Sequence, residues 1–265
     1  MRIIGHRGAS LITPENTKES IIKAFDIGAD GAECDVTVTL DDQIILLHDD
    51  TTKRTCIHDS EYNAEETNYE ILKKLDAGSF LSNEFSYVRI PLLSDVLAIT
   101  PNNKNLFIEV KSGGLNQGVS DKLKKAFNKF INESTHEFDN CFFISFDHTF
   151  INELKRTFPK LKVMYLTTYI PYPGQWPDLK TITHLRNLIS EAKKNSVDGI
   201  DLENSHVIEK EWIQEIKNSG LKSAIWSYRH KDTVENAKKY MSFGVDYLKT
   251  DEPDTVKASI KPTIA

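Results

Sequence analysis

Two acidic residues in one short apolar run are the first residues whose types and spacing could support chemistry. Glu33 and Asp35 lie in the run Gly31–Val38, on either side of Cys34. Side chains alternate between the faces of a strand, so both carboxylates should share one face and Cys34 should point to the other. Two buried carboxylates on one face are costly without a compensating positive charge. Mg²⁺ and Ca²⁺ prefer oxygen ligands, so the pair indicates a divalent metal site.

Two histidines lie before and after this acidic pair. His6 follows the first apolar run of the chain, and His48 ends the run that follows Asp35. We read Asp41 and Asp42 as a two-residue hairpin turn, and the resulting register places His48 directly opposite Asp35. A slip of one residue would turn His48 away from the acids. Histidine, with an ordinary pKa near ~6.5, can act as a base or an acid at neutral pH.

A third carboxylate and two cationic residues complete the set. Glu109 and Lys111 share one face at the end of the apolar run Leu106–Val110, and Arg7 follows His6. An isolated Glu-x-Lys pair is more often a solvent-exposed strand end, but the preceding apolar residues favour a buried strand. A divalent ion, Arg7 and Lys111 could neutralise the non-bridging oxygens of a phosphodiester. The set therefore favours phosphodiester cleavage.

The elements that must carry these residues alternate regularly along the chain. Eight apolar runs have the near-continuous hydrophobicity of strands buried on both faces. They are Arg2–Gly5, Gly31–Val38, Leu106–Val110, Cys141–Ser145, Lys162–Leu166, Asp198–Leu202, Lys222–Trp226 and Asp246–Lys249. Helical patterns follow at Pro14–Ile27, Gly118–Ile131, Phe150–Phe158, Thr183–Asn195, Glu209–Ser219 and Thr233–Phe243. This order favours a single (β/α)₈ TIM barrel over residues 1–265, rather than a doubly wound sheet.

Two segments interrupt the alternation. Residues 49–105 are a long polar stretch, which we read as a small insertion after the second βα unit, on the catalytic face. It should contain a helix near Asn68–Leu75 and another after Pro91. Residues 169–177 are rich in proline and aromatic residues, and a substrate lid and a rigid surface loop are equally compatible with them.

Local signals suggest how the first helix begins and ends. Thr13, Pro14 and Glu15 read as a cap, a first-turn proline and an acid at the start of the helix. Gly28 reads as its C-terminal stop. Among the remaining aromatic residues, Trp226 ends a predicted strand and could line the pocket. We expect most of the other histidines to be surface residues; they are His58, His136, His148, His184, His206 and His230.

Composition restricts the classes of function. A net charge of -6 argues against a nucleic-acid-binding protein. The 3 cysteines have no paired spacing, which fits a reducing compartment. No apolar run approaches the ~20 residues that span a bilayer, and the N-terminus lacks a signal-peptide pattern. We therefore expect a cytoplasmic protein without a transmembrane segment, whose oligomeric state the sequence leaves open.

At this point the chain resembles the glycerophosphodiester phosphodiesterase family. The resemblance covers nearly the whole chain and rests on many short motifs in the family's order. They are His6-Arg7-Gly8, Pro14-Glu15-Asn16-Thr17, Gly28-Ala29-Asp30, Glu33-x-Asp35-Val36, His48-Asp49, Thr52-x-Arg54-Thr55, Ile90-Pro91-Leu92-Leu93, Glu109-x-Lys111, Ser145-Phe146, Trp226 and Thr250-Asp251-x-Pro253. Each string is weak alone, and together they are specific.

The resemblance implies a role for each matching residue. A single divalent cation, Mg²⁺ or Ca²⁺, would be held by three carboxylates, which are Glu33, Asp35 and Glu109. His6 and His48 would be the acid/base pair. Arg7 and Lys111 would bind the phosphate, and Glu15 and Asn16 would support these residues. The implied reaction converts a small-molecule glycerophosphodiester to glycerol 3-phosphate and an alcohol, with a cyclic phosphate as a possible intermediate.

Some residues depart from the family pattern. The family often has Asp-Gly at the turn occupied by Asp41 and Asp42, and a Thr-Val-Asn-like run where Ser227, Tyr228 and Arg229 follow Trp226. The second departure leaves substrate selection open. Asp251 is expected to cap the next helix rather than to face the site.

Alternative functions remain. A lysophospholipase D or a sphingomyelinase D-like enzyme would share the two histidines and the metal, and would act on lipids. A non-catalytic barrel that binds phosphorylated ligands should lack one of the five central residues, and all are present. A metal-dependent sugar isomerase fits Arg7 and Lys111 less well.

Overall fold

The computed structural model describes residues 1–57, 60–112, 118–169, 179, 181–227 and 233–260. In this part of the chain, eight parallel strands form a closed barrel. They are β1 (Arg2–Gly5), β2 (Gly31–Val38), β4 (Asn105–Val110), β5 (Cys141–Ser145), β6 (Lys162–Leu166), β7 (Gly199–Glu203), β8 (Lys222–Trp226) and β9 (Tyr247–Thr250). Strand β1 pairs with both β2 and β9, which closes the barrel and confirms the predicted (β/α)₈ fold.

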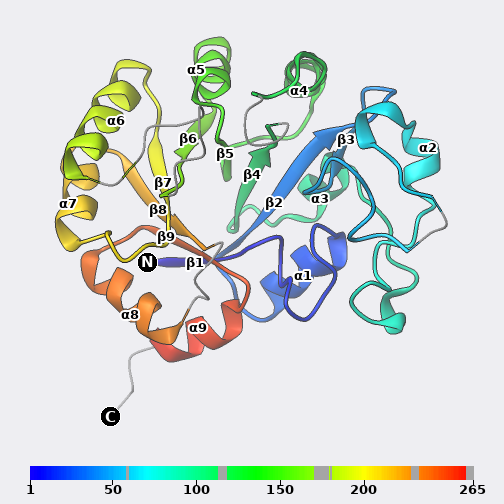
Figure 1. Ribbon diagram of the computed structural model, residues 1–265, viewed down its shortest axis with the longest axis horizontal. Helices are drawn as coiled ribbons and strands as arrows, with labels where there is room; N and C mark the ends of the chain where they lie inside the picture. Colours follow the sequence, from blue (N-terminus) through cyan, green and yellow to red (C-terminus); the bar gives the residue numbers. More distant parts are fainter. Residues whose placement is uncertain (58–59, 113–117, 170–178, 180, 228–232, 261–265) are drawn as a thin grey trace.

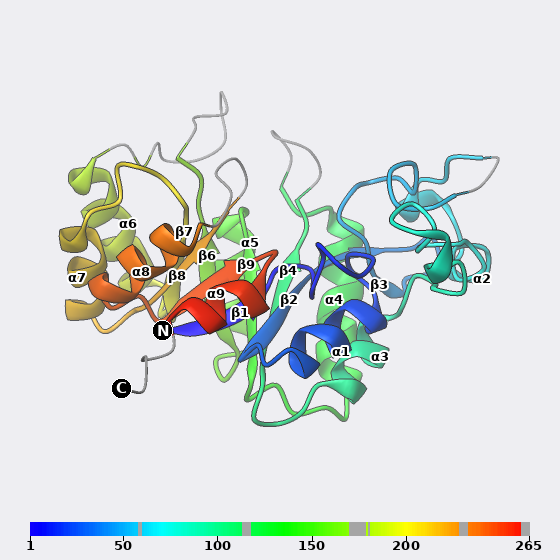
Figure 2. The same cartoon turned by 90° about the horizontal axis from the view of Figure 1, so that it is seen from below.

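Helices surround these strands (Figures 1 and 2). They are α1 (Lys18–Asp26), α3 (Leu93–Ile99), α4 (Asp121–Glu133), α5 (His148–Thr157), α6 (Ile182–Lys194), α7 (Lys210–Asn218), α8 (Val234–Phe243) and α9 (Pro253–Ile260). Five of the predicted strands have the observed bounds, and the other three differ by one residue at one or both ends. In the described residues, no helix is both long and apolar enough to cross a membrane.

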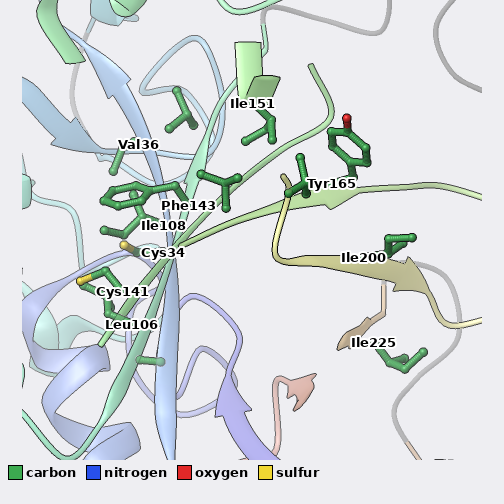
Figure 3. Close-up of a cluster of buried hydrophobic side chains, with 14 of the residues drawn as sticks. Cys34, Val36, Leu106, Ile108, Cys141, Phe143, Ile151, Tyr165, Ile200 and Ile225 are labelled. Carbon is green, nitrogen blue, oxygen red and sulfur yellow. The ribbon is translucent and has the colours of Figure 1, made fainter. Parts of the chain in front are cut away.

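Apolar side chains pack on both faces of the barrel strands. The larger layer lies between strands and helices, and Figure 3 shows Cys34 there with Cys141, Ile108 and Phe143. A smaller cluster fills the barrel interior, where the rings of Phe107 and Phe142 stack at 4.8 Å. Cys34 therefore points outward, as predicted, and Glu33 and Asp35 on either side of it point inward.

The chain leaves the barrel after β3 (Ile44–Leu46), which pairs with β2 in antiparallel fashion. The following segment holds the 3₁₀ turns η1 (Ala64–Glu66) and η2 (Asn83–Phe85) and the short helix α2 (Tyr69–Leu72). It lies to one side of the barrel, opposite α6, α7 and α8 (Figures 1 and 2). Its buried residues form a satellite core with β3, made of Ile45, Leu47, Cys56, Ala64, Leu72, Ala77 and Ile90.

The predicted hairpin register is wrong by one residue. Val36 pairs with Leu46 and Val38 with Ile44, so the partner of Asp35 in this register is Leu47, whose N–H donates to the Asp35 carbonyl at 3.2 Å. The cause is the turn, which has three residues because Thr39 pairs with Gln43. Asp42 is the third residue of this turn, and its φ of 60° is the left-handed conformation that three-residue hairpin turns have at this position.

The start of the first helix also differs from the prediction. Helix α1 begins at Lys18, and Thr17 caps it by accepting a hydrogen bond from the Ser20 N–H at 3.1 Å. The Thr13 hydroxyl instead donates to the Ala9 carbonyl at 2.9 Å. Residues 7–17 are thus a loop at the carboxyl end of β1. The predicted stop at Gly28 is confirmed, because Gly28 has φ of 91° directly after the last turn.

Candidate active site

Three carboxylates meet at the carboxyl end of two neighbouring strands. Glu33 and Asp35 come from β2, and Glu109 of β4 is the register partner of Asp35. One oxygen from each residue lies within 4.8 Å of the other two, and all three residues are buried. Asp35 Oδ1 is buried without a hydrogen-bond partner among the described residues. Three clustered carboxylate oxygens, with one Asp35 oxygen that accepts no hydrogen bond, fit the oxygen ligands that a hard divalent cation prefers.

The pKa values of Glu33 and Asp35 are shifted in opposite directions. Burial, and then the charge of Asp35, raise the pKa of Glu33 to about 7. Burial acts in the same direction on Asp35, but the charges of Lys111 and Arg7 outweigh it and hold that pKa well below its usual range. Glu33 is therefore the acid whose ionised form is least stable in this cluster. A bound cation would stabilise that ionised form.

His6 lies at the carboxyl end of β1, beside Glu33. Its Nε2 is 3.9 Å from Glu33 Oε2, and its Nδ1 is 2.7 Å from Asp251 Oδ1. Burial lowers the pKa of His6, but the hydrogen bond to Asp251 and the charge of Glu33 outweigh it, so the pKa is raised. The expectation that Asp251 caps the next helix is therefore wrong: it faces the site, where Ser10 Oγ also donates to it at 3.0 Å.

His48 reaches the site by a route that strand alternation does not describe. Strand β3 ends at Leu46, so the side chain of His48 is no longer governed by the hairpin register. His48 lines a small pocket together with Glu15 and Asn16, and Asn16 contacts Asp35, which places His48 near the acids. His48 Nδ1 pairs with Asp49 Oδ1 at 2.6 Å. Each histidine thus pairs with its own aspartate through Nδ1. In both histidines Nε2 is the other ring nitrogen, which does not contact that aspartate.

Arg7 binds the acids through both its backbone and its side chain. Its φ of 53° is left-handed, and in this conformation the Arg7 N–H donates to Glu33 Oε2 at 2.8 Å. Its Nε lies 3.2 Å from Asp35 Oδ2, and its Nη1 donates to Glu15 Oε1 at 2.8 Å. Gly8 must follow, because its φ is 85° and a Cβ there would lie 2.5 Å from the backbone of Ser20.

Asn16 fixes Asp35 from the loop side. The Asn16 amide donates to Asp35 Oδ2 at 2.8 Å, and the Asp35 N–H donates to Asn16 Oδ1 at 2.9 Å. Asn16 is also left-handed, with φ of 55°. Lys111 lies on the other side, with its Nζ 2.7 Å from Glu109 Oε1 and 3.5 Å from Asp35 Oδ1.

Trp226 lies at the carboxyl end of β8, where its indole N–H donates to the Thr167 carbonyl at 3.0 Å. Its ring meets Phe146 edge-on, with centroids 5.6 Å apart. Both rings pack on the interior cluster of the barrel. Residues 228–232, which follow Ser227, and residues 170–177 of the aromatic loop lie outside the described residues.

One buried ion pair inside the barrel was not predicted from the sequence. Lys249 of β9 and Asp201 of β7 lie inside the barrel with Nζ and Oδ2 2.5 Å apart. Their side chains are 2% and 0% exposed. The charge of Lys249 counteracts the rise in the pKa of Glu33. Alternation along β7 and β9 could have indicated inward charges, but not that they pair.

Among the other histidines, which were expected to lie mostly on the surface, His148 is an exception. It is buried on α5, stacks on the ring of Tyr165 at 4.1 Å, and its Nε2–H donates to the Leu166 carbonyl at 3.0 Å. His206 is exposed, and His136 and His184 are half-buried. His58 and His230 lie outside the described residues.

The chain is similar to known proteins along nearly its whole length. Residues 6–255 match the glycerophosphoryl diester phosphodiesterase family. A glycerophosphodiester phosphodiesterase of Caldanaerobacter subterraneus is 30% identical over 96% of this chain and 95% of its own. The structure of an Oleispira antarctica phosphodiesterase with its product sn-glycerol-3-phosphate superposes with a TM-score of 0.79, at 24% identity, and covers 98% of this chain and 96% of that one. A glycerophosphodiester phosphodiesterase of Agrobacterium tumefaciens superposes with a TM-score of 0.76, at 21% identity, over 97% of this chain and 99% of that one. The chain therefore belongs to the glycerophosphoryl diester phosphodiesterase family, a family of phosphoric diester hydrolases, as its motifs predicted.

Proposed function

We propose that this protein hydrolyses small glycerophosphodiesters to glycerol 3-phosphate and an alcohol, using two histidines and one divalent cation, Mg²⁺ or Ca²⁺. The observation that carries the proposal is the buried set of three carboxylates whose oxygens lie within 4.8 Å of one another, with His6 Nε2 3.9 Å from Glu33 Oε2. Glu33, Asp35 and Glu109 would hold the cation. The bound ion would supply positive charge at the non-bridging oxygens of the phosphate.

Arg7 and Lys111 would bind the same phosphate from two sides. Both side chains are largely buried, at 15% and 17% exposure, and both contact Asp35. Buried cations interact strongly with an anionic substrate because little water screens them. Glu15 and Asn16 would keep Arg7 and Asp35 in position.

The two histidines would move the protons of the reaction. In the first step one imidazole takes the proton of the glycerol 2-hydroxyl as that oxygen bonds to phosphorus. The other imidazolium gives a proton to the alcohol oxygen as its bond to phosphorus breaks. In the second step water opens the cyclic phosphate, the proton transfers run in reverse, and both histidines return to their starting states. Failure to trap a cyclic phosphate by rapid quench would contradict this route.

The test is an assay of chelator-stripped protein with glycerophosphocholine and glycerophosphoethanolamine. Mg²⁺ and Ca²⁺ are added separately, and glycerol 3-phosphate is measured. His6→Ala and Glu33→Ala should abolish the metal-restored product. The matched exchanges His136→Ala and Glu70→Ala should leave activity unchanged, because His136 precedes the amino end of β5, opposite the site, and Glu70 is an exposed residue of α2.

The absence of product from folded wild-type protein with either metal would contradict the proposal. Lysophosphatidylcholine, assayed in parallel, then distinguishes a lysophospholipase D from a barrel that only binds phosphorylated ligands.

We also propose a cytoplasmic location, which is supported by three buried free thiols at Cys34, Cys56 and Cys141.

A further inference from the structure

One guanidinium from outside the barrel contacts two carboxylates of the site at once. Arg54 Nε donates to Asp49 Oδ2 at 2.6 Å, and its Nη2 reaches Asp49 Oδ1 at 3.3 Å. The same group donates to Glu15 twice, from Nη1 at 2.7 Å and from Nη2 at 2.9 Å. Arg54 thus uses the planar fork of its side chain to join two acids that come from different loops.

Each of these acids holds a residue with a proposed role in the reaction. Asp49 Oδ1 lies 2.6 Å from Nδ1 of His48, and Glu15 Oε1 lies 2.8 Å from Nη1 of Arg7. The contacts form one continuous chain from His48 through Arg54 to Arg7. Its ends are an acid/base group and a phosphate-binding group, whose separation must suit one substrate.

The backbone around Arg54 is itself fixed. Thr51 bridges to Asn63 and Ile57 bridges to Asp76, so both sides of Arg54 are tied to the rest of the segment. Cys56 is 6% exposed in the satellite core. Leu47, the residue before His48, belongs to the same core. The core therefore places Arg54 and His48 relative to each other.

We propose that Arg54 is a positioning residue, which aligns His48 with Arg7 through Asp49 and Glu15; this inference rests on the proposed function. At 44% exposure a single ion pair would contribute little to stability, but the bidentate contacts of Arg54 form a network, so its effect on stability is measured beside its effect on activity. Lysine cannot replace it, because one ammonium cannot present a planar fork to two carboxylates.

The experiment measures steady-state hydrolysis of glycerophosphocholine by the full chain with saturating Mg²⁺. Arg54→Ala and Arg54→Lys should both lower kcat by about 10–100-fold, in the range seen when a supporting residue is removed. KM should rise as well, because Arg7 loses one of its supports. The pH profile of kcat should also shift, because Asp49, the partner of His48, loses its contact with Arg54. Guanidinium ion added to Arg54→Ala should restore part of kcat.

The neighbouring Lys53 gives a matched control. Its side chain is 76% exposed and pairs only with Glu61, at 3.4 Å, among the ion pairs of the described residues, so Lys53→Ala should keep the wild-type values. Mg²⁺ affinity, measured by calorimetry, should be the same in all variants within about twofold, since Arg54 contacts none of the three metal-binding acids.

The outcomes separate this inference from the proposed function. An active wild type whose Arg54 variants keep kcat, KM and pH profile overturns the role of Arg54 and leaves the proposed function standing. An inactive wild type overturns both. If Arg54→Ala melts at a lower temperature than the wild type, rescue by guanidinium supports a positioning role, and loss of activity without rescue overturns it.

Discussion

The two site histidines are held in different ways. Asp251 pairs with His6 and is supported by the hydroxyl of Ser10, whereas Asp49 pairs with His48 and is supported by Arg54. Burial raises the pKa of Asp251, but the hydrogen bond to His6 outweighs it and the pKa is lowered. The hydrogen bond to His48 is the main reason that the pKa of Asp49 is lowered. Both aspartates therefore stay ionised and keep each Nδ1 protonated.

His148 should make stability depend on pH. Burial lowers its pKa to about 4, from 6.5 in the unfolded chain. Between these values the unfolded state binds more protons, so the free energy of unfolding rises with pH. The contribution is complete above 6.5, is lost as pH falls to about 4, and amounts to about 3 kcal/mol.

Urea denaturation at several pH values between about 4 and 7 measures this effect. His148→Gln, whose amide can still donate to the Leu166 carbonyl, should flatten the pH dependence. The same exchange at the exposed His206 is the control. An unchanged slope in His148→Gln would show that another group causes the dependence.

The buried pair of Lys249 and Asp201 should show strong coupling in stability. Lys249→Met leaves a buried carboxylate without its partner and should cost about 3–5 kcal/mol. The double variant with Asp201→Val removes both charges and should recover most of that loss. Thermal and urea unfolding of the two single variants and the double variant give the coupling energy. Costs that simply add in the double variant would contradict this account.

At the level of elements, β2 contributes most to the site. Its eight residues are all buried, and it pairs with β1, β4 and β3. Glu33 and Asp35 are therefore fixed by neighbours on both sides. The loop after β1 carries two non-glycine residues in the left-handed conformation, Arg7 and Asn16, each at a cost of about 1–3 kcal/mol. Hydrogen bonds to the β2 acids stabilise both.

The satellite core should affect catalysis although it lies outside the barrel. Leu72 of α2 is 0% exposed in that core, and Leu185 of α6 is 0% exposed in the main layer. Either leucine changed to alanine should cost about 2–5 kcal/mol, because a cavity remains. Only Leu72→Ala should also lower kcat, since its core places Arg54 and His48. Kinetics below the melting temperature of both variants test this, and equal kcat values would contradict it.

At the scale of the whole molecule, net charge and site charge differ. The chain carries a net charge of -6, yet three cations, Arg7, Lys111 and Lys249, lie at or below the acids. The barrel thus concentrates opposite charges in one buried region, where they interact strongly. A chain with a negative net charge can therefore still carry positive charge at one buried site.

Metal binding should stabilise the fold as a whole. Mg²⁺ at about 100 times its dissociation constant adds about 2.7 kcal/mol to the free energy of unfolding. For a chain of this size this corresponds to a rise in Tm of about 5–10 °C. Glu33→Gln should lose the rise, and Glu70→Gln, an exposed acid on α2, should keep it. Scanning calorimetry with and without metal measures both. A full rise in Glu33→Gln would exclude Glu33 as a ligand.

The sequence by itself determined the barrel and the acidic cluster. Buried parallel strands have continuous apolar runs, which are visible in short windows, so the strand bounds were predicted to within one residue. Alternation along β2 placed Glu33 and Asp35 inward and Cys34 outward, as observed. Glu109 could be assigned to the same cluster because neighbouring parallel strands end at the same rim of the barrel. All of these depend on local pattern and on one repeated rule of geometry.

Only the tertiary structure decided which partners hold these residues. Asp251 meets His6 across 245 positions because β9 pairs with β1 when the barrel closes. Arg54 meets Glu15 across 39 positions because the satellite core packs beside the barrel. The hairpin register depended on one left-handed residue, Asp42, that no periodicity shows. Contacts of this kind depend on closure, packing and single backbone angles, which short sequence windows do not contain.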